Sequence, residues 1–212
     1  MKIIKTFENF SEDDVEYDFD ELSADAKNHA VENERDSMHD AIGDWWYEDI
    51  INDETEKLKG EGFSDRNLEI LFDGFNSQGD GASFTGRVDD NDVFIKETLG
   101  MKMPDAAIEN ILIEVIRIDS RHVHENSVRL QCEVDGEEEI EAFNFGEDIV
   151  INVNVEDYCE DIDKTGGEWV KSRCKSIFER LRKEYESHFE EEHIIADIKA
   201  NGIKFDEDGN II

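Results

Sequence analysis

The residues in this sequence whose types and spacing could do chemistry are mostly carboxylates. Residues 133–163 contain 13 acidic side chains and no basic one, and residues 40–56 contain seven acids and no base. Carboxylates three or four residues apart on a helix lie about 5–6 Å apart, close to the phosphate spacing along one nucleic-acid strand. These runs predict a surface that imitates a nucleic-acid backbone. A solvated polar face or adaptation to high salt is the structural alternative.

The mimicry hypothesis assigns partner binding to carboxylates in both acidic runs. On a helix predicted over residues 37–59 they are Asp40, Asp44, Glu48, Asp49, Asp53 and Glu56. In the second run they are Glu137, Glu138, Glu139, Glu141, Glu147, Asp148, Glu156 and Asp157.

A second candidate is the glycine-rich segment 73–86, whose composition suits a phosphate-binding loop. Its ligand-binding residues would be Asn76, Ser77, Gln78, Gly79, Asp80 and Gly81. The segment matches neither GxxxxGK[ST] nor GxGxxG. Because Gly-Asp-Gly is also what a hairpin turn requires, we favour the turn interpretation.

Two possible metal sites are incomplete. His122 and His124 stand near a strand end without a third histidine or cysteine close in sequence, and zinc requires three or four ligands. Residues 161–165 begin like a calcium loop, but its twelfth position is Ser172 where the loop requires glutamate. We therefore expect no metal at either place.

Catalytic and redox signatures are also lacking. The three cysteines, Cys132, Cys159 and Cys174, are widely spaced and form no CxxC pair, which predicts reduced thiols and no disulfide framework. Neither a serine elbow nor a Cys–His signature stands out. The sequence thus predicts a binding protein without a cofactor, not an enzyme.

The charge balance limits the partners. The 212 residues include 57 acidic and 22 basic side chains, for a net charge of −35. Such a charge argues against direct binding to nucleic acid or to an anionic membrane, since both require Lys and Arg to neutralise phosphates. The N-terminus lacks an apolar signal region, and no apolar run approaches the ~20 residues of a membrane helix. We expect a soluble, cytosolic protein.

The elements that must position these residues follow an α+β pattern. Hydrophobic periodicity predicts strands at 2–7, 67–72, 82–88, 111–118, 128–134 and 149–155. A loop at 135–139 would pair Val134 with Ile140 and Cys132 with Ala142, which places apolar residues on one face. A small hairpin is predicted at 204–212.

Three helices are predicted. The first covers 24–35 with Ser23 as its N-cap, and the second covers 37–59 and ends at Gly60 and Gly62. The third is long, begins after a capping box at 165–168 and ends at Asn201-Gly202. Together these give one α+β domain over 1–212, with a mostly antiparallel sheet of about six strands, two N-terminal helices and one long C-terminal helix. Any subdivision would separate 1–62 from 63–212.

Four stretches are distinctive: residues 17–27 (YDFDELSADAK), Trp45-Trp46, residues 72–86 (FDGFNSQGDGASFTG) and the final helix ending in residues 205–209 (FDEDG). Their order and spacing resemble a family of uncharacterised bacteriophage proteins, some described as antitoxin-like. The resemblance implies a phage-encoded protein in the cytoplasm of an infected bacterium. It implies no catalytic residues, and the acidic run 133–163 is not part of its motif.

The leading hypothesis is therefore a counter-defence protein. It would bind and inhibit a host nuclease, toxin, restriction-type or CRISPR complex by offering an acidic nucleic-acid mimic to a basic groove. The protein itself would contact neither nucleic acid nor membrane. A homodimer is compatible with the sequence. The alternative is that loop 73–86 binds or sequesters a small ligand such as a nucleotide signal. A third option is an accessory domain whose charge serves only solubility.

Overall fold

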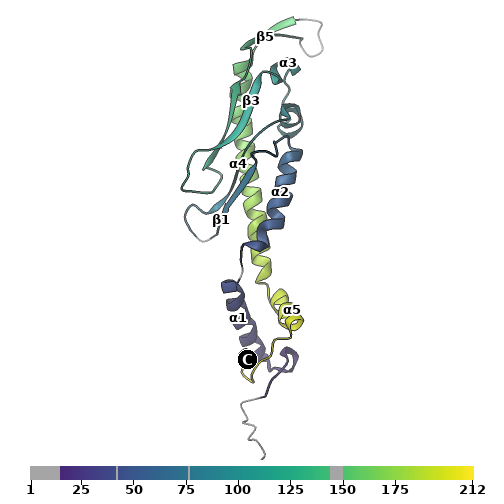
Figure 1. Ribbon diagram of the computed structural model, residues 1–212, viewed down its shortest axis with the longest axis vertical. Helices are drawn as coiled ribbons and strands as arrows, with labels where there is room; N and C mark the ends of the chain where they lie inside the picture. Colours follow the sequence, from purple (N-terminus) through teal and green to yellow (C-terminus); the bar gives the residue numbers. More distant parts are fainter. Residues whose placement is uncertain (1–14, 42, 76, 144–149) are drawn as a thin grey trace, which may run out of the picture. The chain divides into compact units, whose positions relative to one another are not determined.

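The computed structural model describes residues 15–41, 43–75, 77–143 and 150–212 (Figure 1). The helices are η2 (Phe19–Glu21), α1 (Ala24–Ala41), η3 (Asp44–Tyr47), α2 (Glu48–Gly60), the π-helix η4 (Val93–Thr98), α3 (Asp105–Ile108), α4 (Val155–His188) and α5 (Glu191–Asn201). The strands are β1 (Glu69–Asp73), β2 (Gly81–Arg87), β3 (Ile111–Arg117), β4 (Val128–Val134), β5 (Glu139–Phe143) and β6 (Val150–Asn154). The predicted strand 2–7 lies outside the described residues.

The chain divides into two compact units. The first combines residues up to Trp46 with residues 183–212, and the second comprises residues 47–182. The long helix α4 contributes residues 155–182 to the second unit and its last turns to the first.

The first unit has a small apolar core from both ends of the chain. The side chain of Ser23 accepts a hydrogen bond from the Ala26 amide at 3.2 Å, so the predicted N-cap of α1 is confirmed. Tyr17 and Phe205 exchange two backbone hydrogen bonds, of 2.8 and 3.1 Å. The core consists of Phe19, Leu22, Ala26, Ala30, Val31, Ile194, Ile198 and Phe205.

The second unit is built on an antiparallel sheet with the order β1-β2-β3-β4. Buried and less buried residues alternate along β3 and β4, as expected for strands with one face in the core. Within this unit, α4 runs beside the sheet and α2 (Figure 1). Trp169 of α4 stacks on Phe63 and meets Phe84 and Phe94 edge to face. These aromatic contacts hold the helix against the sheet.

The remaining two strands form a separate sheet, β5-β6. Ile140 lies opposite Val153, and Val134 lies opposite Ile111 of β3. The predicted pairing of Val134 with Ile140 is therefore wrong. Asn110 accepts hydrogen bonds from the amides of Asp135 and Glu137, so the chain after β4 turns onto the α3–β3 connection instead of folding back on β4.

Several helix boundaries differ from the predictions. The first predicted helix continues to Ala41, and a short η3 separates it from α2, so a single helix over 37–59 is wrong. The long helix begins at Val155, directly after β6, so residues 165–168 are helical and form no capping box. Gly166 lies in the interior of this helix. The close packing against Leu130 explains the glycine, because a Cβ at this position would lie 2.8 Å from Leu130 Cδ1.

Two helix ends agree with the predictions. The α2 helix ends at Gly60, as expected, and α5 ends at Asn201 with Gly202 in the left-handed conformation. The predicted long C-terminal helix is divided, since α4 ends at His188 and α5 begins at Glu191.

The fold is thus α+β, with antiparallel strands, N-terminal helices and a long C-terminal helix, as predicted. The described strands form a four-stranded and a two-stranded sheet, where one sheet of about six strands was expected. Within the described part of the chain, no helix is long and apolar enough to cross a membrane.

Candidate functional site: an acidic surface on the second unit

One end of the second unit gathers the elements that carry the acidic run 133–163. The Val155 amide donates to the Glu138 carbonyl at 2.9 Å, which joins the start of α4 to the start of β5. The Cys132 amide donates to Asp163 Oδ1 at 2.6 Å, which joins β4 to α4. Figure 1 shows β5, α3 and the beginning of α4 at this same end of the unit. The described residues of the run are therefore brought together in space.

The carboxylates of this run face solvent. Two of the 13, Glu147 and Asp148, lie outside the described residues, and the other 11 are all exposed. Within the described chain, none of the 11 lies in an ion pair with a base. We call them the acidic surface: Glu133, Asp135, Glu137, Glu138, Glu139, Glu141, Glu156, Asp157, Glu160, Asp161 and Asp163.

The start of α4 explains how several of these charges are tolerated so close together. Glu156 and Asp157 occupy the first turn of the helix, where the positive end of the helix dipole favours carboxylates. The Asn154 side chain also accepts a hydrogen bond from the Glu156 amide at 2.9 Å and so caps the helix.

The other predicted acidic run is divided by the fold. Asp40 belongs to α1 and Asp44 to η3, both in the first unit. In α2, Glu48 and Asp49 are exposed. The remaining two are engaged with bases: Asp53 with Arg180 at 2.6 Å, and Glu56 with Lys59 at 2.8 Å. The structure thus does not place residues 40–56 on one continuous helical stripe.

A buried acid on α2 holds this helix to α4. The Glu54 side chain is only 3% exposed and contacts Arg180 and Lys57 at 2.6 Å and Arg173 at 3.2 Å. Burial acts to raise the pKa of Glu54, but hydrogen bonds from Lys57 and Arg180 outweigh it and hold the pKa below its usual value. The neighbouring Glu61 has a pKa raised by burial. We assign this ion-pair network a structural role, because it joins α2 to α4.

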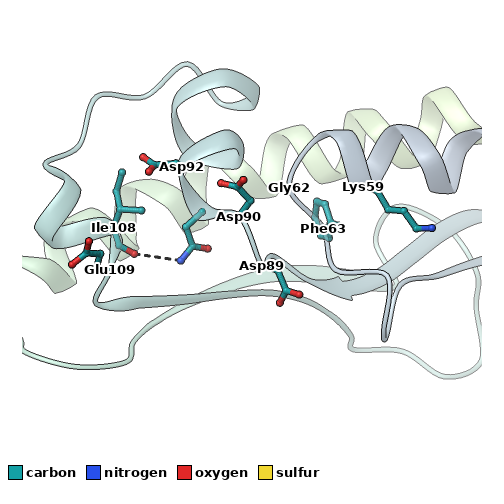
Figure 2. Close-up of a pocket in the computed structure, with 9 residues that line it drawn as sticks. Lys59, Gly62, Phe63, Asp89, Asp90, Asp92, Ile108 and Glu109 are labelled. Atoms are coloured by element: carbon teal, nitrogen blue, oxygen red, sulfur yellow. Dashed lines mark hydrogen bonds between the residues drawn. The ribbon is translucent and has the colours of Figure 1, made fainter.

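A pocket of about 420 Å³ lies next to α3 (Figure 2). Asp90 and Asp92 lie at the start of η4, and Glu109 lies beside Ile108 (Figure 2). The Asn91 side chain donates to the carbonyls of Ile108 and Ile111. The lining combines carboxylates with the apolar groups of two residues: Lys59, Gly62, Phe63, Asp89, Asp90, Asn91, Asp92, Ile108 and Glu109.

The glycine-rich segment forms the predicted turn, since Asp73 lies opposite Gly81 in the β1–β2 hairpin. Asp80 Oδ2 accepts a hydrogen bond from the Ser77 amide, and Gln78 is exposed. Asn76 lies outside the described residues. Gly79 has a φ of +105°, and a Cβ there would lie 2.2 Å from the His122 ring. The turn therefore packs on the loop that carries the histidines.

The histidine loop contains a carboxylate–imidazole pair. His122 Nδ1 lies 2.9 Å from Asp119 Oδ2, and the rings of His122 and His124 are stacked with centroids 5.6 Å apart. Hydrogen bonds from the Arg121 amide and from His122 lower the pKa of Asp119 to about 2. Within the described residues, no group of three potential metal ligands is present here or elsewhere.

Sequence reasoning missed both the pocket and the Asp119–His122 pair. The run Asp89-Asp90-Asn91-Asp92 was visible, but its proximity to Glu109 depends on tertiary folding. The spacing of Asp119 and His122 was also visible, but their position beside the glycine-rich turn depends on tertiary contacts, such as the packing of Gly79 against His122.

The family model for a domain of unknown function (DUF8835) matches residues 46–191, well over half of the chain, and the chain belongs to this family. The match includes the whole second unit and hence the acidic surface. Neither a curated protein nor a solved structure matches the chain significantly.

Proposed function

We propose that this member of the DUF8835 family is a phage-encoded counter-defence protein that inhibits a host nucleic-acid-acting enzyme, toxin or restriction-type complex. Its acidic surface would occupy the basic groove in which the partner binds nucleic acid. The motif at residues 72–86 motivates the phage setting, which implies action in the cytoplasm of an infected bacterium. The protein itself would perform no catalysis and use no cofactor.

The observation that carries this proposal is the acidic surface. Its 11 carboxylates are exposed, and no ion pair with a base neutralises them in the described part of the chain. The basic groove of a partner that binds phosphates would also attract these carboxylates electrostatically. By contrast, Asp53 and Glu56 of α2 already have basic partners, which makes them weaker contributors.

The neighbouring pocket suits a basic side chain of such a partner. Phe63 and Ile108 offer apolar contact for the aliphatic stem of an arginine or lysine, while Asp90 and Glu109 offer carboxylates to its charged end. Asn110 connects this place to the acidic surface, because it accepts hydrogen bonds from the amides of Asp135 and Glu137.

A competition experiment tests the proposal. Tagged protein is used to isolate a partner from bacterial lysate over a salt gradient, and the partner is then purified and bound to a fluorescent nucleic-acid duplex. Wild-type protein should displace the duplex, with an affinity that falls as salt rises, because exposed charge pairs are screened.

A charge-matched pair of variants localises the effect. Glu→Gln substitution at Glu137, Glu138, Glu139 and Glu141 should weaken displacement about tenfold, since four exposed pairs contribute about 0.2–1 kcal/mol each. The same substitution at Glu16, Glu191, Glu192 and Glu207, all exposed on the first unit, should leave displacement unchanged. Equal losses in both variants, or the absence of a salt-sensitive partner, would contradict the proposal.

A second candidate is favoured by the packing of the glycine-rich turn on the histidine loop. Residues 117–124 contain Arg117, Arg121, His122 and His124 with Asp119 as the sole acid, an unusual balance in a chain of net charge −35. Such a loop beside Gly79 could receive the phosphate of a nucleotide signal, which the protein would sequester.

Calorimetric titration with nucleotides tests this second candidate. Joint replacement of Arg121 and His122 by alanine should abolish a phosphate-dependent interaction, whereas the Gln substitutions at residues 137–141 should not affect it. If no nucleotide binds the wild-type protein, the turn has a structural role only.

A further inference from the structure

Two cysteine thiols meet beneath the acidic surface. Cys132 lies in β4 and Cys159 in α4, 27 residues apart, and their Sγ atoms are separated by 3.1 Å. A disulfide bond is about 2.05 Å long, so the two sulfur atoms would have to approach each other by about 1 Å for the bond to form. Sequence spacing alone had indicated unrelated reduced thiols.

The surrounding structure holds the two thiols close together. The Cys132 amide donates to Asp163 Oδ1 at 2.6 Å, one helical turn beyond Cys159. Cys132 also lies opposite Ile113 in the β3–β4 ladder. The neighbouring Ile162 is fully buried. Both thiols therefore sit on well-packed elements, and their proximity does not depend on a loose loop.

We propose that Cys132 and Cys159 form a reversible disulfide, a redox modification site that links β4 to α4. The oxidant is a low-molecular-weight disulfide of the glutathione class. The inference does not depend on the proposed function, because it concerns the chemistry of the chain alone.

The geometry sets the order of the two steps. The Cys132 thiol donates its hydrogen bond to Cys159 Sγ, which favours ionisation at Cys159. The Cys159 thiolate attacks the small disulfide, forms a mixed disulfide and expels one thiolate. Cys132 then loses its proton and attacks Cys159 Sγ, which expels the second thiolate. Two protein thiols thereby lose two electrons and two protons, and the small disulfide becomes two thiols.

The rate should be low at neutral pH and rise in alkaline solution. Burial raises the pKa of both Cys132 and Cys159, and the negative charges of Asp163 and Glu133 raise both pKa values further. Glu156 has the same effect on Cys159. Because the thiolate is the attacking species, fewer molecules are reactive at pH 7 than at pH 9.

Peptide mapping of the wild-type protein is the direct test. After incubation with oxidised glutathione at pH 8.5, the intact protein should lose the mass of two hydrogen atoms. A non-reducing digest should contain the Cys132 and Cys159 peptides joined, with Cys174 still alkylatable after denaturation. Dithiothreitol should restore all three thiols, and the oxidised protein should melt about 5 °C higher or more, because the cross-link restricts the unfolded chain.

Cysteine variants supply the controls. Cys174→Ser should oxidise like the wild type, since Cys174 is a buried thiol whose pKa is raised to about 12, mainly by burial, and which takes no part in the pair. Cys132→Ser should stop at a glutathione adduct on Cys159. Three free thiols in the oxidised wild type, or a bond involving Cys174 or a second molecule, would overturn the inference. The wild-type digest decides the question even if a variant fails to fold.

Discussion

Carboxylates in this chain differ in role according to what surrounds them. Glu54 is buried among Arg173, Arg180 and Lys57, whereas Glu56, two residues later, is exposed and pairs with Lys59. Sequence reasoning treated the acids of this helix by spacing alone. The bases that neutralise Glu54 come largely from α4, more than 100 residues away, and spacing within α2 carries no information about them.

Replacement of Glu54 by glutamine should therefore destabilise the protein strongly. The change removes the more buried of two carboxylates that contact Arg173 and leaves Glu61, whose side chain is 28% exposed, at 3.4 Å. We expect the loss to cost about 3 kcal/mol of unfolding free energy. The matched control Glu56→Gln should cost less than about 0.5 kcal/mol. Urea denaturation followed by circular dichroism measures both, and similar losses would show that Glu54 is not a buried ionic anchor.

Glu54 also predicts the direction in which the stability of the protein changes with pH. The pKa of Glu54 in the folded protein is lower than its usual 4.5, so its contribution is complete above that pH and is lost as the pH falls through the lower value. The stability difference between wild type and Glu54→Gln should be constant from about pH 5.5 to pH 8 and shrink in more acid solution. A difference that grows on acidification would contradict the assigned direction.

Elements with strong hydrophobic periodicity were predicted well, and their boundaries less well. The 3,4 spacing of Val170, Cys174, Ile177 and Leu181 marks the buried face of α4. The start of the helix was missed because Thr165-Gly166-Gly167-Glu168 has the composition of a cap, although it lies in the interior of the helix. Packing against Leu130 explains Gly166, and that contact is invisible in the sequence.

Alanine substitutions in the glycine pair test this continuous helix. A Cβ added at Gly167 would meet no atom within 4 Å, so Gly167→Ala should stabilise the protein by about 0.5–1 kcal/mol through helix propensity. Gly166→Ala should lack this gain and be less stable than Gly167→Ala by at least about 1 kcal/mol, because of the contact with Leu130. Thermal denaturation of both variants checks the difference, and equal effects would argue against the helix packing described for this segment.

Strand pairing was the least predictable feature at this scale. Alternation identified β4, and the expected loop at 135–139 implied a further strand after it, but neither revealed which neighbour each strand would pair with. Asn110 accepts hydrogen bonds from the amides of Asp135 and Glu137 and so turns the chain away from β4. The next strand, β5, pairs with β6 instead. This arrangement places β5 beside α3, and so it also determines the surroundings of the acidic surface.

The net charge of −35 affects the whole molecule. Like charges repel one another in the folded state, and salt screens the repulsion over about 10 Å at 0.1 M. The melting temperature should therefore rise between about 20 mM and 500 mM sodium chloride. The variant with glutamine at Glu137, Glu138, Glu139 and Glu141 should show a smaller rise. A fall in melting temperature with salt would mean that attractive ion pairs dominate.

For the molecule as a whole, the sequence predicted that the surface charge is negative, but it predicted only part of where the charged side chains gather. The run 133–163 was identified from composition, and folding brings its described members to one end of the second unit. The run 40–56 is predicted on the same grounds, yet the fold divides it between two units and pairs three of its members, Asp53, Glu54 and Glu56, with bases. Composition determines how many charges must be accommodated, whereas tertiary contacts determine which of them are neutralised.

The most direct test of the proposed decoy function is the displacement of a labelled nucleic-acid duplex from the purified partner, measured by fluorescence anisotropy. We predict that the wild type and the first-unit control variant displace the duplex equally, while the variant at residues 137–141 is about tenfold weaker. Displacement that is unchanged in that variant, or that does not weaken as salt rises, would contradict the claim that the acidic surface acts as the nucleic-acid mimic.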